Sequence, residues 1–343
     1  MEAIILAGGF GTRLRPLTNT RPKPLVPIGN VPLVEYIIAK MPHKIVKKVI
    51  LAVSYMKEEM ERYFEEHEHP FEIVCVREEE PLGTGGAIKN VERELGDQFL
   101  VFNGDVISSV DVRKMRDYHK EKGGIGTLAL WEVDDPTAFG VVGLNEKGRI
   151  TAFQEKPKKE EAVSNLINAG CYILESEILD YIPSGKVVSV EREVFSSSDV
   201  LDKGLYGFRF TGYFEDAGTP EKLLKAQKVI FRTHMNEDYL NIKNKKVKII
   251  GENSQLDVET KLFRPVVIGE GCVLRRCIVG PWLSLGSDVS VGSYTRIENS
   301  ILLNNIKIGK KAYIRNSIVG ENVIIEDEVV VEGEVVADGE HLR

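Results

Sequence analysis

Short apolar runs alternate with amphipathic segments along the first two thirds of the chain. The apolar runs are typical of strands buried on both faces, and they cover residues 4–6, 49–53, 73–76 and 99–102. The amphipathic segments between them predict helices, and they cover residues 32–41, 56–66 and 85–95. This alternation predicts an α/β domain with a mainly parallel sheet.

Later apolar runs predict a more mixed set of strands, and they cover residues 126–131, 140–144, 150–154, 169–174 and 206–210. Thr219-Pro220 then marks the start of a helix that we expect to reach about residue 233, because threonine caps helices and proline fits their first turn. We therefore assign residues 1–232 to one domain and residues 233–259 to a linker.

The C-terminal segment has a different periodicity. Aliphatic residues recur at every sixth position from Val267 to Leu303, and the pattern resumes, each time after a shift of one residue, at Ile308 and at Val319. Such self-similarity indicates a repeat architecture, and period six indicates a parallel β-helix. The pattern resembles the hexapeptide repeat of left-handed β-helices, in which three hexads form one coil. We predict that residues 260–343 form this domain.

The composition is that of a globular protein, with 43% hydrophobic and 28% charged residues and a formal net charge of −7. The acidic balance argues against general nucleic-acid binding, which needs a basic face. We expect no membrane partner, because no apolar stretch approaches the length of a membrane span. The N-terminus has neither a basic segment nor an apolar leader, so we expect a cytoplasmic protein.

One loop contrasts with this acidic balance. Residues 6–28, here called the basic loop, read LAGGFGTRLRPLTNTRPKPLVPI and contain Arg13, Arg15, Arg21 and Lys23 but no acidic residue. Glycines let a backbone approach a phosphate and direct N–H groups at it. The loop is neither a Walker A motif, which needs Gly-Lys-Ser/Thr, nor a dinucleotide fingerprint, whose third glycine is replaced by Leu14.

The basic loop resembles the signature of the sugar-1-phosphate nucleotidylyltransferases. Further motifs of that family follow in order, and they read PLGTGGA (81–87), NGD (103–105), FGVV (139–142), EKP (155–157), NAG (168–170) and FEDAGTP (214–220). The resemblance implies a Rossmann-like nucleotidyltransferase domain with a mixed, mainly parallel sheet, followed by a left-handed β-helix. It also implies that an NTP and a sugar 1-phosphate give an NDP-sugar and pyrophosphate.

The resemblance implies roles for particular residues. Arg13 and Lys23 would be catalytic, and Asp105 and Asp216 would bind Mg²⁺. The expected nucleotide-binding residues are Leu6, Ala7, Gly8, Gly9, Gly11, Thr12, Gly83 and Thr84. The expected sugar-phosphate-binding residues are Gly140, Glu155, Lys156 and Asn168.

The chemistry of the two aspartates agrees with a metal site. Asp105 follows a buried strand at its carboxyl end, where open α/β sheets bind ligands, and Mg²⁺ commonly takes one or two carboxylates plus substrate oxygens. Taken alone, Asp105 could instead form an Asx turn, and Asp216 could be a solvated acid before a helix.

The motifs leave the substrate pair open. The resemblance implies that the motif PLGTGGA (81–87), here called the base turn, binds the nucleotide base, and it lacks the glutamine common in thymine- and uracil-specific relatives. Residues 51–56 and 189–195 resemble mannose-1-phosphate guanylyltransferases. We therefore favour GTP and mannose 1-phosphate, with glucose-1-phosphate uridylyl- or thymidylyltransferase as the alternative.

Two further alternatives are a bifunctional enzyme with an acetyltransferase β-helix and a non-catalytic regulatory subunit. Residues 235–340 contain no histidine for acetyl transfer, and the charged site residues that a regulatory subunit would lack are present. We expect a homo-oligomer assembled through the β-helix, because its faces and ends need covering.

Overall fold

The computed structural model describes residues 1–233 and 248–343. These residues form two compact units. The first contains residues 1–10 and 40–214, and the second contains residues 11–39 and 215–343. The basic loop is therefore divided between the units, and most of it groups with the C-terminal part of the chain. The sequence analysis had placed residues 11–39 with the first domain.

The first unit is built on a nine-stranded mixed sheet with the strand order β10-β9-β11-β6-β1-β4-β5, in which β8 pairs with β11 and β12 pairs with β8. Four neighbouring strands pair in parallel, and they are β1 (Glu2–Leu6), β4 (Lys48–Val53), β5 (Glu72–Arg77) and β6 (Gln98–Asn103). The remaining strands are β8 (Gly126–Glu132), β9 (Gly140–Leu144), β10 (Ile150–Glu155), β11 (Leu166–Glu175) and β12 (Leu205–Arg209). Because β11 runs antiparallel to β6, the predicted mixed, mainly parallel sheet is confirmed.

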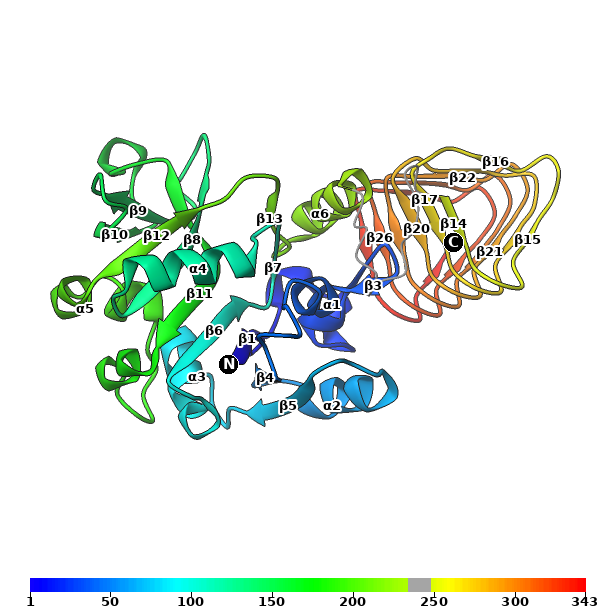
Figure 1. The fold of residues 1–343 in the computed structure, drawn as a ribbon. Coiled ribbons are helices and arrows are strands. Elements are labelled where there is room, and N and C mark those ends of the chain that lie inside the picture. The colour runs from blue at the N-terminus through cyan, green and yellow to red at the C-terminus, as the bar shows by residue number, and fades with distance from the viewer. Residues whose placement is uncertain (234–247) are drawn as a thin grey trace. The chain divides into compact units, whose positions relative to one another are not determined.

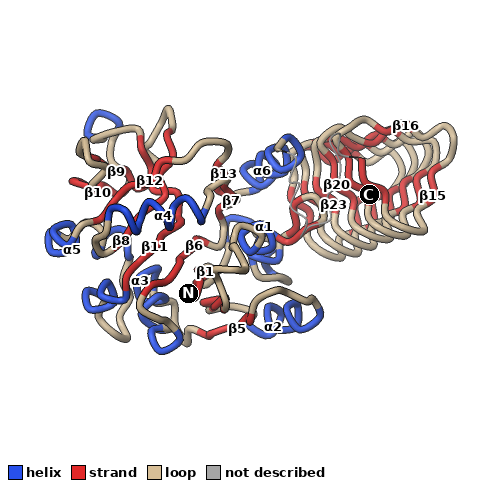
Figure 2. The backbone as a smooth tube through the Cα atoms, in the orientation of Figure 1, coloured by secondary structure: helices blue, strands red, loops and turns tan. Residues whose placement is uncertain are grey.

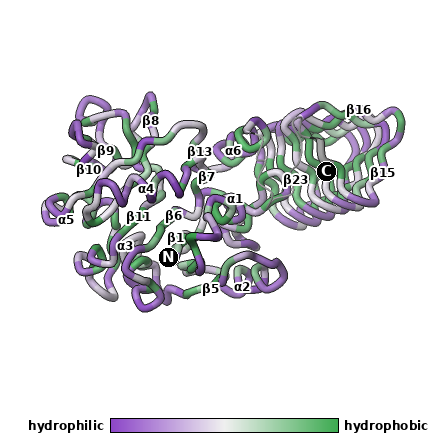
Figure 3. The backbone as a smooth tube through the Cα atoms, in the orientation of Figure 1, coloured by the Kyte–Doolittle hydropathy of each residue, from purple (hydrophilic) through white to green (hydrophobic). Residues whose placement is uncertain are grey.

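Helices cover this sheet (Figure 1). They are α2 (Lys57–Glu66), α3 (Gly83–Asn90), α4 (Val112–Lys122) and the short α5 (Ser198–Lys203). Helix α4, which packs on β8, β11 and β12, was not predicted. Its signal is Asp111, whose Oδ1 accepts hydrogen bonds from the N–H groups of Arg113 and Lys114 and so caps the helix. The core holds the apolar strand residues, and these strands are mostly hydrophobic in Figure 3.

The second unit contains the β-helix, whose short strands alternate with corner turns (Figure 2). The first of its three parallel sheets holds β14 (Lys248–Ile250), β17 (Val266–Ile268), β20 (Leu283–Leu285), β23 (Ile301–Leu302), β26 (Ile318–Val319) and β29 (Val335–Val336). The second holds β15 (Gln255–Leu256), β18 (Val273–Leu274), β21 (Ser290–Val291), β24 (Lys307–Ile308), β27 (Ile324–Ile325) and β30 (His341–Leu342). The third holds β16 (Lys261–Leu262), β19 (Ile278–Val279), β22 (Arg296–Glu298), β25 (Tyr313–Arg315) and β28 (Val330–Glu332).

The coils repeat at 17 residues and not at three full hexads. Val266 pairs with Leu283 and Ile301 pairs with Ile318, each 17 positions later. Three steps are 18 residues long, from Lys248 to Val266, from Gln255 to Val273 and from Ile278 to Arg296. Successive inward residues are usually six positions apart, as from Leu302 to Ile308. At one of the three corners they are only five apart, as from Ile297 to Leu302, and this shortens the coil by one residue. Of the aliphatic residues at period six, Val279, Leu285, Val291 and Ile297 belong to the core of the coils. At residues 267, 273 and 303 it is the neighbours Ile268, Leu274 and Leu302 that belong to this core.

One outward row of the first sheet is buried although it does not face the inside of the coils. Ile301 and Ile318 occupy this row and are nearly inaccessible, as is Ser284. Helix α6 (Pro220–Arg232) of the same unit contacts the row, because the hydroxyl of Ser284 donates to Gln227 Oε1 at 2.7 Å. The chain thus covers part of its own β-helix.

Helix α6 confirms the predicted helix start. Thr219 Oγ1 accepts a hydrogen bond from the N–H of Lys222, and Pro220 occupies the first helical position. The second unit also contains β2 (Pro27–Ile28), β3 (Val31–Pro32) and α1 (Leu33–Ile38), and β13 (Phe214–Asp216) enters it from the first unit.

The domain boundaries at residues 232 and 260 stay predictions. Of the predicted linker, residues 234–247 lie outside the described residues, while β14 and β15 already belong to the coils. Within residues 1–233 and 248–343, no helix is both long and apolar enough to cross a membrane.

Candidate functional site

The carboxyl ends of three neighbouring strands bring the predicted motifs of the first unit together. Leu6, the last residue of β1, pairs with Ala52 of β4 and Asn103 of β6. The N–H of Gly104 donates to the carbonyl of Leu6 at 3.0 Å, and a Cβ at Gly104 would lie 2.5 Å from that oxygen. Only glycine fits here. The turn that carries Asp105 therefore lies directly against the start of the basic loop, whose first glycines, Gly8 and Gly9, are here called the glycine turn.

A buried carboxylate lies beside the glycine turn. Glu78 follows β5 and is 3% exposed, and a Cβ at Gly8 would lie 2.9 Å from its Oε1. Its Oε2 accepts the N–H of Leu82 at 3.2 Å, while Ser54 donates to the carbonyl of Gly8. Burial raises the pKa of Glu78, and the hydrogen bond from Leu82 offsets part of this shift. The sequence analysis missed Glu78, because three consecutive glutamates precede Pro81 and nothing local shows which one points inward.

The predicted base turn is held by a second network of hydrogen bonds, which is partly buried. Gly83 has φ +72°, and a Cβ there would lie 2.6 Å from the carbonyl of Val188. The hydroxyl of Thr84 donates to Glu191 Oε2 at 2.6 Å and accepts the N–H of Val190 at 3.0 Å. The conformation of the turn therefore depends on residues about a hundred positions away in the sequence.

Glu191 also connects to Asn168, one of the predicted sugar-phosphate-binding residues. The hydroxyl of Tyr172 donates to Glu191 Oε1 at 3.4 Å and accepts a hydrogen bond from Asn168 Nδ2 at 2.7 Å. Burial, with the nearby charge of Glu191, raises the pKa of Tyr172 well above its ordinary value, so its hydroxyl stays protonated. Thr84 and Asn168 are thereby joined through Tyr172 and Glu191, and these two connecting residues were not predicted.

The other predicted sugar-phosphate-binding residues, Gly140, Glu155 and Lys156, lie on or directly after the hairpin formed by β9 and β10. Gly140 pairs with Glu155, and a Cβ at Gly140 would lie 2.8 Å from the ring of Phe153. Lys156 has φ +50°, a conformation that is uncommon for a residue other than glycine and often marks functional sites. Its N–H donates to the carbonyl of Phe139 at 2.9 Å, and its side chain is 56% exposed beside Glu155. The ammonium group can therefore meet an anion from solvent.

In the second unit, Arg13 and Asp216 flank Gly218. A Cβ at Gly218 would lie 2.7 Å from Asp216 Oδ1 and 2.8 Å from Arg13 Nη2. Asp216 Oδ2 pairs with the ammonium group of Lys222 at 2.5 Å. Asp216 Oδ1 is buried and finds no hydrogen-bond partner among the described residues. A buried carboxylate oxygen in this state fits a metal ligand, because Mg²⁺ prefers oxygen donors.

The same unit holds the remaining part of the basic loop. Gly11 has φ +61°, and a Cβ there would lie 2.9 Å from Thr18 and 3.2 Å from Cβ of Lys23. The hydroxyl of Thr18 donates to the carbonyl of Gly11 at 2.8 Å, and Thr12 begins a short 3₁₀ helix that also contains Arg13. The loop is therefore closed on itself, with the side-chain stem of Lys23 against Gly11.

A metal centre made by protein side chains alone is absent from the described ranges, where no three His, Cys, Asp or Glu residues come together. Asp105 belongs to the first unit and Asp216 to the second. A site with one or two carboxylates suits Mg²⁺, which completes its shell with water and phosphate oxygens.

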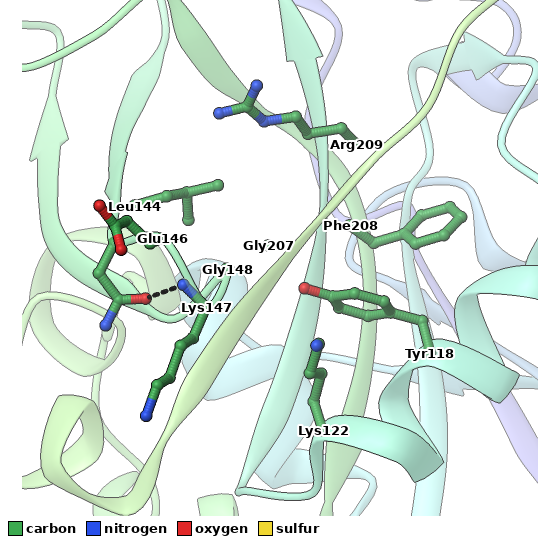
Figure 4. A pocket seen from close by; sticks show the side chains of 10 residues that line it. Tyr118, Lys122, Leu144, Glu146, Lys147, Gly148, Gly207, Phe208 and Arg209 are labelled. Carbon is green, nitrogen blue, oxygen red and sulfur yellow. Dashed lines mark hydrogen bonds between the residues drawn. The ribbon is translucent and has the colours of Figure 1, made fainter.

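A cavity of about 470 Å³ lies elsewhere on the first unit, among α4, the β9–β10 turn and β12. Its lining includes Tyr118 and three basic residues, Lys122, Lys147 and Arg209, but no predicted site residue. The three basic side chains point in different directions (Figure 4). Lys122 is paired with Glu121 at 3.1 Å. This cavity therefore does not compete with the motif-bearing loops as the candidate site.

Comparison with known families matches both parts of the chain. Residues 2–232 match the family described as nucleotidyl transferase, and residues 262–341 match the family described as GMPPB C-terminal domain. These two matches correspond to the α/β sheet and to the coils.

Individual proteins resemble the chain over most of its length. It is 33% identical over 313 residues to the mannose-1-phosphate guanylyltransferase of Mycobacterium tuberculosis, covering 90% of this chain and 81% of that protein. It is 34% identical over 347 residues to the bifunctional protein GlmU of Methanococcus maripaludis, covering 94% and 78%. The crystal structure of HddC from Yersinia pseudotuberculosis complexed with GMP-PN matches with a TM-score of 0.54 and 30% identity, covering 66% of this chain and 98% of that one.

Proposed function

Because the chain belongs to the nucleotidyl transferase family, we propose that it makes GDP-mannose and pyrophosphate from GTP and mannose 1-phosphate. The relative from Mycobacterium tuberculosis is named for this activity, and so is a relative from Arabidopsis thaliana that is 34% identical over 328 residues. HddC was crystallised in complex with GMP-PN, which supports a guanine nucleotide as the partner.

The reaction joins two anions. A phosphate oxygen of the sugar phosphate attacks the α-phosphorus, a new P–O bond forms, and the bond to the β-phosphate breaks so that pyrophosphate leaves with its electron pair. No general base is needed, because the attacking oxygen is already ionised. Catalysis then consists of positioning and charge neutralisation.

We assign charge neutralisation to Arg13 and Lys23. The single observation that carries the proposal is the arrangement around Gly218, where the guanidinium group of Arg13 and the unpartnered Oδ1 of Asp216 lie on either side of one glycine. A guanidinium group next to a metal-binding carboxylate suits a triphosphate, because the arginine and the bound cation both neutralise its negative charge. The glycines at positions 8, 9 and 11 would supply backbone donors to the phosphates.

We assign metal binding to Asp105 and Asp216. Members of this family use a divalent cation, and Mg²⁺ is the one that we propose here. When bound, it would neutralise negative charge on the phosphate oxygens. Lys222 already compensates one oxygen of Asp216, which leaves the other oxygen for the cation.

We assign the sugar phosphate to the β9–β10 hairpin and to Asn168. The strained backbone of Lys156 and its exposed ammonium group support its proposed contact with the phosphate. Glu155 and Asn168 would bind sugar hydroxyls, and Gly140 would let the sugar approach the backbone. The link from Asn168 through Glu191 to Thr84 would orient the sugar and nucleotide sites together.

We propose that Glu78 favours guanine as the base. Guanine presents two adjacent donors, N1–H and the 2-amino group, and an ionised carboxylate only accepts. Glu78 is buried against Gly8 and accepts a hydrogen bond from Leu82, directly before the base turn. Uracil and thymine offer one donor flanked by two acceptors, so they fit a carboxylate less well.

A uridylyl- or thymidylyltransferase is the alternative within the same reaction class. A second activity in the β-helix is supported by the name of GlmU, a bifunctional protein. Against it, the coils from residue 248 to 340 contain no histidine, and His341 at the end pairs with Glu326 at 2.6 Å. The charged residues proposed for catalysis are all present, which argues against a purely regulatory subunit.

The decisive experiment is a pyrophosphate-release screen of the common NTPs against several sugar 1-phosphates with the full chain and Mg²⁺. Highest kcat/KM for GTP with mannose 1-phosphate supports the proposal. Preference for UTP or dTTP with glucose 1-phosphate supports the alternative, and no release with any pair contradicts the reaction class.

We also propose that the protein is cytoplasmic and that it forms a homo-oligomer through the β-helix. Exposed apolar side chains on the coils support such assembly, and they include Val258, Phe263, Tyr294 and Val330. Light scattering at micromolar concentration measures the mass in solution, and a monomer would contradict the proposed assembly.

A further inference from the structure

One basic residue of the loop is turned toward the β-helix. The guanidinium group of Arg21 pairs with Glu321 Oε1 at 3.1 Å through Nη1 and with Asp338 Oδ2 at 3.0 Å through Nη2. Its neighbour Thr20 donates to the same Asp338 oxygen at 2.5 Å. The side chain of Arg21 is 15% exposed, so two consecutive loop residues are fixed on the last coils. The composition of the basic loop suggests that all of its cations face a triphosphate. Arg21 is different, because it pairs with carboxylates of the β-helix.

The two carboxylates belong to an ordered ladder on successive coils. Asn304, Glu321 and Asp338 occupy equivalent corner positions 17 residues apart. Asn304 Nδ2 donates to Glu321 Oε1 at 3.2 Å, and the N–H of Glu321 donates to Asp338 Oδ1 at 2.7 Å. Hydrogen bonds within the β-helix therefore fix both carboxylates independently of the arginine. Such preorganised, partly buried ion pairs contribute more to stability than exposed ion pairs do.

The charges respond to this arrangement. Burial alone would lower the pKa of Arg21, but the hydrogen bonds and charges of Glu321 and Asp338 outweigh it and raise that pKa. Burial alone would raise the pKa of Asp338, but hydrogen bonds from Thr20 and Glu321 and the charge of Arg21 lower it. Arg21 and Asp338 therefore stay ionised at neutral pH.

A second attachment to the β-helix lies directly after the C-terminal end of the basic loop. Gln227 of α6 is 1% exposed, and its Oε1 accepts the N–H of Gly29 at 3.1 Å and the hydroxyl of Ser284 at 2.7 Å. Its Nε2 donates to the carbonyls of Trp282 and Ser300, each at 3.1 Å. All of its hydrogen-bonding positions are thus used. Asn30 adds a hydrogen bond to the carbonyl of Leu285 at 2.5 Å.

The two attachments enclose the segment that carries Lys23. Lys23 lies two residues after Arg21 and six before Gly29, and its stem lies against Gly11, which precedes Arg13 by two residues. We propose that Arg21 is a positioning residue: its ion pairs with Glu321 and Asp338 let the β-helix hold the loop segment that carries Arg13 and Lys23. This inference rests on the proposed roles of Arg13 and Lys23, and it gives the β-helix a part in catalysis without any reaction of its own.

The competing role for Arg21 is direct binding of the triphosphate. The two roles differ in what the carboxylates do. If Arg21 binds phosphate, removing Glu321 and Asp338 frees it and leaves GTP binding intact or stronger. If Arg21 positions the loop, removing the carboxylates has the same effect as removing the arginine, and the combined variant adds little.

The test compares Arg21→Ala, the isosteric pair Glu321→Gln with Asp338→Asn, and all three substitutions together. We expect each to lower kcat about 10- to 100-fold, because small displacements of catalytic groups have effects of this size, while KM for GTP changes less than about threefold. Arg21→Lys keeps the charge but not the two-pronged contact, so it should recover only part of kcat. The matched control is Lys311→Ala with Glu328→Gln, an exposed pair on the same coils joined at 2.6 Å, which should leave kcat unchanged.

Hydrogen exchange of residues 11–30 gives a second readout that needs no activity. We expect faster exchange there in both the arginine and the carboxylate variants, and unchanged exchange in the control. Unchanged exchange in the carboxylate pair, or normal kcat in that pair with a raised KM for GTP in Arg21→Ala, overturns the inference. An inactive wild type contradicts the proposed function, and the exchange experiment then still decides the positioning role.

Discussion

Arg13 and Asp216 flank Gly218, with the arginine Nη2 and the aspartate Oδ1 each within 3 Å of the point where a methyl group would be. Gly218→Ala would push both groups away from that point. We expect turnover to fall about 10- to 100-fold while the fold is kept, measured as pyrophosphate release. Gly143→Ala is the matched control, because its nearest neighbour would lie at 3.4 Å. Normal turnover in Gly218→Ala would show that this arrangement is not used.

Asp216→Asn removes a metal-binding charge and keeps the side-chain volume. Because Oδ1 of Asp216 is buried without a partner among the described residues, we expect turnover to fall by about two orders of magnitude or more, with a higher Mg²⁺ concentration needed for half-maximal rate. Asp105→Asn should behave in the same way. Pyrophosphate release titrated with Mg²⁺ measures both effects, and the exposed Asp202→Asn is the control. An unchanged Mg²⁺ response would remove the metal assignment.

Glu78→Gln exchanges one acceptor of the buried carboxylate for a donor. We expect the ratio of kcat/KM for GTP to that for UTP to fall about 10-fold or more, because a mismatched buried hydrogen bond discriminates strongly. Glu79→Gln, one residue away and exposed, is the control and should leave the ratio unchanged. Equal ratios in the two variants would mean that Glu78 does not contact the base.

Lys156→Ala removes the exposed ammonium group of the β9–β10 hairpin. We expect KM for the sugar 1-phosphate to rise about 10-fold or more, because a charge-assisted contact to phosphate is lost, while KM for GTP stays near its wild-type value. Lys158→Ala, which removes a lysine that is more exposed and pairs only loosely with Glu161 at 3.7 Å, is the control. An effect confined to GTP would place Lys156 on the nucleotide instead.

The pair between Arg21 and Asp338 should leave a signature in the pH dependence of stability. The folded-state pKa of Asp338 is lowered from 3.8, so its contribution to the free energy of unfolding is fully present above about pH 5 and is lost as the pH falls through the folded-state value. The stability difference between wild type and Asp338→Asn should therefore be largest at neutral pH and shrink below about pH 4. Urea unfolding at several pH values measures it, and a difference independent of pH would contradict the ion pair.

The sequence predicted features that depend on neighbouring residues. Thr219 and Pro220 mark the start of α6 because capping is local, and the strand-helix alternation predicted the sheet of the first unit. The family motifs predicted candidate site residues, whose roles stay predictions. By contrast, Glu78 and Glu191 were missed because their contacts, with Gly8 and Thr84 respectively, are made with distant segments of the chain.

Two further differences have the same cause. Period six was visible, but the five-residue corner that shortens each coil depends on how the three sheets close. Arg21 looked like the other basic residues of its loop, because nothing within the loop indicates carboxylates some 300 positions later. Charge alone therefore does not distinguish a residue that contacts substrate from one that contacts the scaffold.

The 17-residue repeat sets a limit on how this chain can change in length. β-helices grow or shrink by whole coils, and each coil advances about 4.8 Å along the axis. Here α6 is fixed at Ser284 and Ser300, while Arg21 is fixed further on, at Glu321 and Asp338, two and three coils beyond the coil of Ser284. Deleting one coil between these points would shift the second attachment by one full strand spacing, whereas a coil added before Val266 would leave both in place. Natural length variation in related proteins with this arrangement should therefore concentrate at the N-terminal end of the coils.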